Sequence, residues 1–359
     1  MEEKESFFLL NADELKNRLA EAGFEKYRAK QVFDAVYKNK IFNPLEIPAI
    51  PKKLKEWLSE HFQFFSAKMA GEKQSGDETK KYLFGLSDGN FIECVLLKAP
   101  SEDGGIRKTL CLSTQVGCAC ACKFCASALR GFVRNLTAEE IISQALPFVE
   151  ETIDNGKRIR RFEFENIVVM GMGEPLINYT NLMSALKVFN SAEKFAFGAR
   201  RITVSTCGIA DRLEKLPEDG FPYRLAISLH GATDEVRGKI MPINSRFPLA
   251  RLLGAAEKFS KSCGRMITLE YILIKNVNDS FEQARELAKI AKRLHAHINL
   301  IPYNKVPALS WQRSDAGRRA AFARILDEAG ASYTLRREKG SEIDAACGQL
   351  ALKKSLGPQ

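Results

Sequence analysis

The sequence predicts an α/β protein in which helices cover a parallel sheet. From about residue 108 onward, short apolar runs typical of strands alternate with longer amphipathic stretches typical of helices, and this alternation indicates repeated βα units. The chain has 359 residues, 45 % of them hydrophobic and 27 % charged, which is enough to bury a sizeable core in about two domains. This composition excludes a disordered chain and a coiled coil.

Residues 1–95 predict a small module that precedes the βα units. Asn11 is expected to cap a first helix, and two further helices are expected over residues 27–37 and 54–62. Alternation of apolar and polar residues over 80–97, interrupted by turn residues, predicts a β-hairpin at the end of this module.

The second domain, expected over residues 96–359, carries the βα units. Six strands are expected, at residues 109–113, 166–170, 201–205, 223–229, 266–274 and 297–302. Helices are expected between and after them, at residues 137–152, 179–189, 248–262, 280–294 and 315–329. Periodicity alone does not distinguish a partial or full barrel from an open, doubly wound sheet.

The net charge of the chain is +10, and the excess lies in the second domain. Residues 1–95 hold 15 basic and 16 acidic side chains, whereas residues 96–359 hold 39 basic and 28 acidic ones. Such an excess is compatible with an anionic partner, either nucleic acid or a membrane surface. No run of about 18 apolar residues occurs, and the acidic first residues do not suit a signal peptide, so we expect a cytoplasmic protein.

Four of the nine cysteines form a tight cluster, at Cys118, Cys120, Cys122 and Cys125. In a reducing compartment such a cluster indicates a metal centre rather than disulfides. The spacing C-x3-C-x2-C of Cys118, Cys122 and Cys125 can supply three thiolates to an iron-sulfur cluster and leaves one iron without a protein ligand. The alternatives are inert thiols or a zinc site, for which the sequence offers no second C-x2-C or H-x3-H pair.

C-x3-C-x2-C with an aromatic residue before the last cysteine is typical of radical S-adenosylmethionine (SAM) enzymes. Longer motifs accompany it: YRAKQ (27–31), CLSTQVGC (111–118), GFVRNLT (131–137), GMGEPL (171–176), SLH (228–230) and DAACGQL (344–350). Together they resemble the bacterial dual-specificity RNA methyltransferases of this superfamily, which modify C2 of adenosine. The resemblance implies a partial (βα)6 radical SAM barrel behind an RNA-binding-like N-terminal module. It also implies a [4Fe-4S] cluster, two SAM molecules per turnover, and 23S ribosomal RNA and transfer RNA as substrates.

The resemblance further implies how a methyl group reaches a carbon that SAM cannot methylate directly. In this family one SAM methylates a cysteine, and a second SAM, cleaved by an electron from the cluster, yields the radical that activates this methyl group for addition to C2. Cys347 matches the methyl-carrying cysteine, Cys111 the resolving cysteine that forms a transient disulfide with it, and Glu93 the proton acceptor. On the residues alone, a lone cysteine is more often a small buried hydrophobe, and Glu93 would be an outward-facing strand carboxylate.

The SAM contacts of the family lie at strand ends, and the matching residues are Gly173, Glu174, Ser205, Ser228, Leu229, His230 and Asn304. On the residues alone, Gly-x-Gly-Glu is more often a turn, and His230 more often a structural histidine. Cys120 departs from the family's usual residue, and its spacing is expected to turn its thiol away from the three expected ligands. The cysteines expected to be structural are Cys94, Cys207 and Cys263.

Three functions remain open. The first, which we favour, is methylation of adenosine C2, with a flavodoxin-type electron donor and a monomeric protein. The second is C8 methylation by a Cfr-type enzyme, which shares Cys111 and Cys347, and the third is an RNA-binding iron-sulfur or zinc protein without turnover. Basic runs at 157–161, 200–201, 318–319 and 336–339 suit contacts to RNA phosphates, although solvated faces also carry such runs. The N-terminal module would need a local patch such as Lys26, Arg28 and Lys30.

Overall fold

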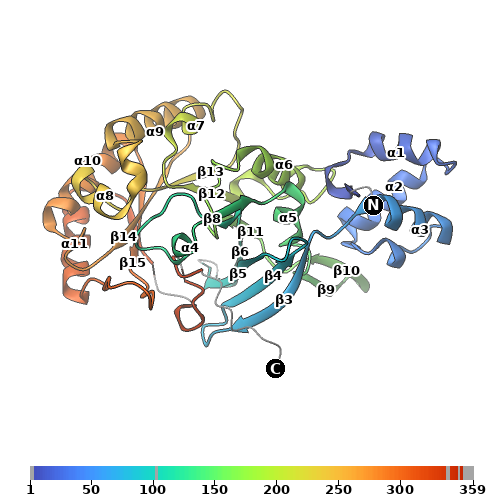
Figure 1. Ribbon diagram of the computed structural model, residues 1–359, viewed down its shortest axis with the longest axis horizontal. Helices are drawn as coiled ribbons and strands as arrows, with labels where there is room; N and C mark the ends of the chain where they lie inside the picture. The colour runs from blue at the N-terminus through green and yellow to red at the C-terminus, as the bar shows by residue number, and fades with distance from the viewer. Residues whose placement is uncertain (1–3, 102–103, 337–339, 347, 351–359) are drawn as a thin grey trace.

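A computed structural model describes residues 4–101, 104–336, 340–346 and 348–350. Ten strands of these residues form one sheet, in the order β16-β15-β14-β13-β12-β11-β6-β5-β4-β3. Helices α7 to α11 lie outside the parallel strands, and α1 to α3 form a separate group at the opposite end of the molecule (Figure 1). Among the described residues, no helix is both long enough and apolar enough to cross a membrane.

The strands are β1 (Glu5–Ser6), β2 (Phe62–Gln63), β3 (Ala67–Gln74), β4 (Lys80–Leu86), β5 (Phe91–Pro100), β6 (Ile106–Cys111), β7 (Gln115–Gly117), β8 (Phe132–Asn135), β9 (Val149–Asp154), β10 (Lys157–Phe162), β11 (Asn166–Val169), β12 (Ile202–Thr206), β13 (Arg224–Ser228), β14 (Thr268–Leu273), β15 (His297–Pro302) and β16 (Tyr333–Leu335). The α-helices are α1 (Ala12–Glu21), α2 (Arg28–Phe33), α3 (Lys52–His61), α4 (Ala126–Leu129), α5 (Ala138–Ser143), α6 (Tyr179–Asn190), α7 (Ala210–Leu213), α8 (Asp234–Ile240), α9 (Leu249–Cys263), α10 (Phe281–Leu294) and α11 (Ala316–Glu328).

The parallel part of the sheet confirms the predicted fold class. All six predicted strands are present as β6 and β11 to β15, and each pairs in parallel with its neighbour. The short β16 adds one further parallel strand that the sequence did not predict. In the described chain β16 and β6 are not hydrogen-bonded to each other, so the barrel is partial and stays open.

The N-terminal module has the three expected helical segments. Asn11 caps α1 in a capping box, in which its side chain accepts from the Glu14 N–H and the Glu14 carboxylate accepts from the Asn11 N–H. The second helix begins as α2 and continues as a π-helical turn over Asp34–Lys38. Aromatic rings join this module to the barrel, since Phe195 lies 5.9 Å from Phe8 between ring centroids.

The predicted hairpin of β4 and β5 is confirmed, and it belongs to the large sheet. β5 pairs antiparallel with β4 on one edge and with β6 on the other. The boundary expected after residue 95 lies inside β5, where Val95 stands opposite Cys111. The sheet therefore continues across this position, and residues of the hairpin share a face with residues of the barrel.

The helix expected over residues 137–152 is wrong beyond its first turns. α5 ends at Ser143, and β9 and β10 follow as an antiparallel hairpin. Pro147 lacks the N–H that a continuing helix requires, and the β-branched residues after it favour a strand. Asn155 and Gly156 have φ angles of 49° and 75°, as a two-residue type I′ turn requires. The Asn-Gly pair was the sequence signal for this hairpin.

This turn can be tested at Gly156, where φ is +75° and an added Cβ would meet nothing within 4 Å. Gly156→Ala should lower the free energy of unfolding by about 1 kcal/mol, because alanine is strained at positive φ. Gly198→Ala is the matched control, since its Cβ would also meet nothing within 4 Å but its φ is −60°. Urea denaturation measures both variants, and equal stabilities would contradict the turn.

Candidate functional site

The carboxyl ends of β11 to β15 surround a cavity of about 150 Å³. Ligand sites of parallel α/β folds lie at this end of the strands, because the loops that follow the strands converge there. Residues from five different strand ends line the cavity, namely Met170, Thr206, Ser228, Ile272 and Ile301. The expected metal ligands Cys118, Cys122 and Cys125 line the same cavity, so the structure brings the predicted cluster ligands and the strand ends together.

The cysteines belong to a loop, residues 118–131, that we call the cluster loop. The antiparallel pairing of β7 with β8 closes its base, and the N–H of Cys118 donates to the carbonyl of Gly131 at 3.1 Å. Gly117 has a φ of +74°, and a Cβ there would lie 1.7 Å from the Gly131 oxygen. Only glycine therefore allows the two ends of the loop to approach this closely.

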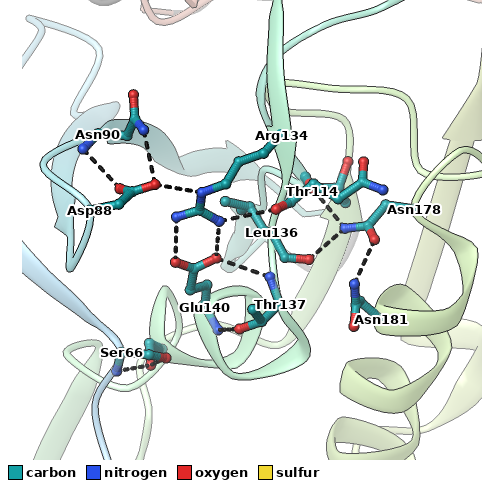
Figure 2. A network of polar contacts seen from close by, with 12 residues as sticks. Ser66, Asp88, Asn90, Thr114, Arg134, Leu136, Thr137, Glu140, Asn178 and Asn181 are labelled. Atoms are coloured by element: carbon teal, nitrogen blue, oxygen red, sulfur yellow. Dashed lines mark hydrogen bonds and ion pairs between the residues drawn. The ribbon is translucent and has the colours of Figure 1, made fainter. Parts of the chain in front are cut away.

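Arg134 of β8 fixes the loop base to two other elements (Figure 2). Its guanidinium donates to both carboxylate oxygens of Glu140, each at 2.8 Å, and through Nε to Asp88 at 2.5 Å. Arg134 thereby holds the pKa of Asp88 well below its usual range. Glu140 also completes the capping box of α5 with Thr137. The β4–β5 turn, the cluster loop and α5 are thus tied by one bidentate cation.

A second set of contacts orders the segment before the cluster loop. Asn178 donates to the carbonyls of Thr114 and Leu136, at 2.8 and 2.7 Å (Figure 2). The GMGEPL segment approaches the same strand end, because a Cβ at Gly171 would lie 2.6 Å from Ser113 Oγ and one at Gly173 would lie 2.6 Å from Gln115 Cβ. These two glycines let the loop after β11 pack directly on the start of β7.

The three expected ligand cysteines are half-buried, and their electrostatics fit a cationic group. Burial raises the pKa of Cys122 and Cys125, and repulsion from Cys125 and Cys118 raises that of Cys122 further. Thiolates held this close to one another need a compensating cation. Iron ions of a cluster would replace the thiol protons and remove this repulsion, so the three residues fit the [4Fe-4S] group that their spacing suggests.

Cys120 and Cys207 depart from their expected roles. Cys120 also lines the cavity, and its hydrogen bond to Cys118 is the main cause that raises the pKa of Cys118, so its thiol does not point away from the others. The Cys120 and Cys207 sulfurs lie 3.1 Å apart, and both lie close to the Glu174 carboxylate. Cys207 was expected to be structural, but it faces the cavity as well. The two positions are far apart in sequence, so spacing could not reveal this contact.

Of the residues expected to contact SAM, Gly173, Glu174, Ser205, Ser228 and His230 line the cavity. Leu229 and Asn304 are buried beside it without lining it. The Glu174 carboxylate accepts from the N–H groups of Cys207 and Leu176, at 2.7 and 3.0 Å, and burial raises its pKa. The side chains of Cys207 and Thr206 also hydrogen-bond to this carboxylate.

His230 has one defined protonation state. Its Nδ1 accepts from the N–H of Ile272 at 3.1 Å, and burial lowers the pKa of the ring to about 3. The ring is therefore neutral at physiological pH and carries its proton on Nε2. Its backbone has a φ of 55°, and its ring meets the edge of Phe124 in the cluster loop at 4.9 Å.

Sequence reasoning missed two charged residues at the site. Glu270 on β14 lines the cavity, burial raises its pKa, and Asn299 donates to it at 2.9 Å. A carboxylate inside the apolar run 266–274 was the available signal. Arg237 is fully buried and donates to the carbonyls of Cys207 and Leu229, at 2.6 and 3.2 Å. No sequence signal distinguished it from a surface arginine.

Glu93 and Cys111 lie on one face of the sheet, next to the C-terminal segment (described residues 340–346 and 348–350). Glu93 precedes Val95 by two residues on β5, and Val95 pairs with Cys111 on β6. Ala345 and Leu350 pack against Val95 and Cys111. The expected methyl-carrying Cys347 lies outside the described residues, whereas Gly348 beside it lines the cavity and its carbonyl accepts from the Ala126 N–H at 2.7 Å.

The basic runs are only partly available for phosphate contacts. On the β9–β10 hairpin, Arg160 and Arg161 pair with glutamates of the facing strand at 3.3 and 3.0 Å. In the N-terminal module, the Arg28 side chain is 17 % exposed and its guanidinium stacks on the exposed Tyr27 ring. Arg336 lines the cavity, and residues 337–339 lie outside the described residues.

Comparisons with known proteins agree with this geometry. The family model of the radical SAM superfamily matches residues 112–288. A probable dual-specificity RNA methyltransferase RlmN 3 of Opitutus terrae is 51 % identical over 95 % of this chain and 92 % of its own length. The probable RlmN of Akkermansia muciniphila is 45 % identical over 94 % and 92 %. The crystal structure of a radical SAM methyltransferase from Sphaerobacter thermophilus matches with a TM-score of 0.87 and 37 % identity, over 96 % of this chain and 99 % of that chain.

The closure of the cluster loop can be tested with two glycines that share a φ of +74°. Gly117→Ala should destabilise the protein by more than about 2 kcal/mol and abolish most iron binding, because its Cβ collides with the Gly131 carbonyl. Gly131→Ala has nothing within 4 Å and should bind iron nearly as the wild type does. Iron content after anaerobic reconstitution measures both. Equal iron in the two variants would contradict the role of the close approach.

Proposed function

The chain belongs to the RlmN family of radical SAM RNA methyltransferases, and on this premise we propose that it methylates C2 of adenosine in 23S ribosomal RNA and of adenosine 37 in some transfer RNAs. The observation that carries this proposal is the arrangement around Cys111. A cysteine and a buried carboxylate, Glu93, share one face of the sheet, and Ala345 and Leu350, which flank Cys347 in the sequence, pack on that face. A reaction through a methylated cysteine needs these groups at one place.

Two sets of residues at the cavity would bind two different groups, the iron-sulfur cluster and SAM. Cys118, Cys122 and Cys125 would hold a [4Fe-4S] cluster, which when bound supplies the electron that cleaves SAM. The residues proposed to hold SAM are Gly173, Glu174, Ser205, Ser228, Leu229, His230 and Asn304. The neutral His230 can only donate from Nε2, so it suits an acceptor atom of that ligand.

The residues on the face of β5 and β6 handle the RNA adduct. Glu93 removes the C2 proton, and the Cys111 thiolate attacks the sulfur of Cys347. The sulfur–carbon bond breaks, its electron pair passes to the methylene carbon on C2, this carbon takes up a proton to become the methyl group, and a Cys111–Cys347 disulfide remains. Burial raises the pKa of Glu93, which suits a base that must take up a proton at neutral pH. Two SAM molecules are used in each turnover, one as methyl donor and one as radical source.

The proposal extends to partners and location. We expect a cytoplasmic monomer that receives its electron from a flavodoxin-type donor. Residues 1–95 would act as the RNA-binding-like module and residues 96–359 as the catalytic domain. The charge excess of residues 96–359 supports binding of the RNA backbone near the catalytic part.

The product of the reaction tests the proposed function. RNA incubated anaerobically with reconstituted protein, SAM and a reductant should contain 2-methyladenosine, measured by mass spectrometry of its nucleosides. If the product is 8-methyladenosine, the protein is a Cfr-type enzyme instead. If SAM yields no 5′-deoxyadenosine and the protein retains zinc, the enzymatic function is wrong.

The resolving step predicts a trapped intermediate. Cys111→Ala should accumulate protein covalently bound to RNA, because the adduct forms but no thiolate breaks its sulfur–carbon bond. Glu93→Gln should stall at a similar stage and accumulate an adduct that keeps its C2 proton, since an amide cannot accept this proton. Denaturing gels with labelled RNA measure it, and Cys263→Ala, a cysteine on α9 away from the cavity, serves as the control. Finding only free, unmethylated RNA with Cys111→Ala would contradict the assigned role.

A further inference from the structure

Strands β4 and β5 bring a lysine and the proposed base together inside the protein. Nζ of Lys81 lies 3.0 Å from Oε1 of Glu93, and the two side chains are only 8 % and 3 % exposed. A buried ion pair must overcome the cost of removing both charges from water, so it contributes little net stability compared with apolar residues. The position of Lys81 beside the proposed base Glu93 therefore points to a role of this lysine in the reaction.

Lys81 also contacts the C-terminal segment. Its Nζ donates to the backbone carbonyl of Asp344 at 3.3 Å, three residues before Cys347. The same segment is held at Gly340, whose N–H donates to Asp77 at 2.8 Å, and at Glu342, which accepts from the Gly76 N–H at 3.2 Å. Lys81 is thus the contact that links this segment directly to the Glu93 carboxylate.

The two oxygens of Glu93 differ in their surroundings. Oε1 is bound by Lys81, whereas Oε2 is buried and has no hydrogen-bond partner among the described residues. The backbone of Glu93 is fixed as well, because Ser113 Oγ donates to its carbonyl at 2.6 Å. An unpartnered buried carboxylate oxygen is costly, and a substrate proton would satisfy it.

We propose that Lys81 is a positioning residue for methyl transfer, acting through Glu93 and the backbone of Asp344; this rests on the proposed function. Its ammonium group holds Oε1, so that Oε2 is the oxygen that takes the C2 proton. In that step the C2–H bond breaks, an O–H bond forms on Oε2, and the electron pair of the broken bond stays with the adenine ring. The second contact fixes the backbone at Asp344, three residues before Cys347 in the sequence.

The charges that face Glu93 determine the pH at which it works. Lys81 on β4 and Lys73 on β3 lower the pKa of Glu93, whereas burial and Asp344 raise it, and Cys111 lies on the same face. Lys81 is the largest of the lowering influences. Because the base must be ionised to accept a proton, loss of Lys81 moves the required pH upward.

The test compares three variants by the rate at which the covalent protein–RNA adduct resolves. The rate is measured between about pH 6 and 9, because the pKa values of buried groups shift by a few pH units. Lys81→Met should accumulate adduct and resolve it about tenfold more slowly at neutral pH, with its profile shifted alkaline by about one unit. Lys81→Arg keeps the charge and should restore most of the rate. Lys80→Met is the control, because Lys80 is the neighbour on β4 whose side chain points to the opposite face.

Two results would overturn the proposal. One is a Lys81→Met profile with the pH dependence of the wild type, which would make Lys81 merely structural. The other is absence of adduct in Lys81→Met under conditions in which Cys111→Ala forms it. Should Lys81→Met not fold, Lys81→Gln keeps a donor without the charge and must show the same alkaline shift. Absence of adduct in both Cys111→Ala and Glu93→Gln would instead refute the proposed function, and the role of Lys81 with it.

Discussion

The candidate site depends on the pairing of β6 along both of its edges. Antiparallel pairing with β5 sets Val95 opposite Cys111, and parallel pairing with β11 sets Val168 opposite the same cysteine. Cys111 is therefore the residue at which the hairpin sheet meets the barrel. A slip of one residue in the pairing with β5 would turn its side chains to the other face and carry Glu93 away from Cys111. The chemistry of the site is set by hydrogen bonds of the main chain before any side chain contributes.

The βα alternation could be predicted from sequence because the spacing of apolar residues differs between the strands and the helices of the barrel. The prediction over residues 137–152 was wrong because the apolar pattern of α5 runs on into β9, and the signals against a helix were Pro147 between them and the Asn155-Gly156 turn that joins β9 to β10. The three expected cluster ligands were predicted from their spacing, and the structure places them at one cavity. Glu93 and Cys111 needed the resemblance, since their proximity arises from strand pairing, and the contact of Cys120 with Cys207 arises only when β12 ends beside the cluster loop.

The cavity gathers more potential negative charge than its apolar walls would tolerate without compensation. Glu174 and Glu270 are both buried, and burial raises the pKa of each. Arg237 supplies a positive charge close to Cys122 and Cys207, and its guanidinium donates to two backbone carbonyls and to the side chain of Asn244, with no direct ion pair to an acidic side chain among the described residues. Its charge is thus left to offset thiolates. This is a reason for an arginine rather than an apolar residue in a fully buried position.

The contacts of the cluster loop with the end of the chain bear on how the protein is made. Ala126 and Ser127 bond to the carbonyls of Gly348 and Leu350, partners more than two hundred residues later in the sequence. Synthesis proceeds from the N-terminus, and domains begin to fold as they emerge. The cysteines of the loop therefore leave the ribosome well before Gly348 and Leu350 are synthesised. Iron held by these cysteines would thus enter an open pocket first, before Gly348 and Leu350 bond to the loop.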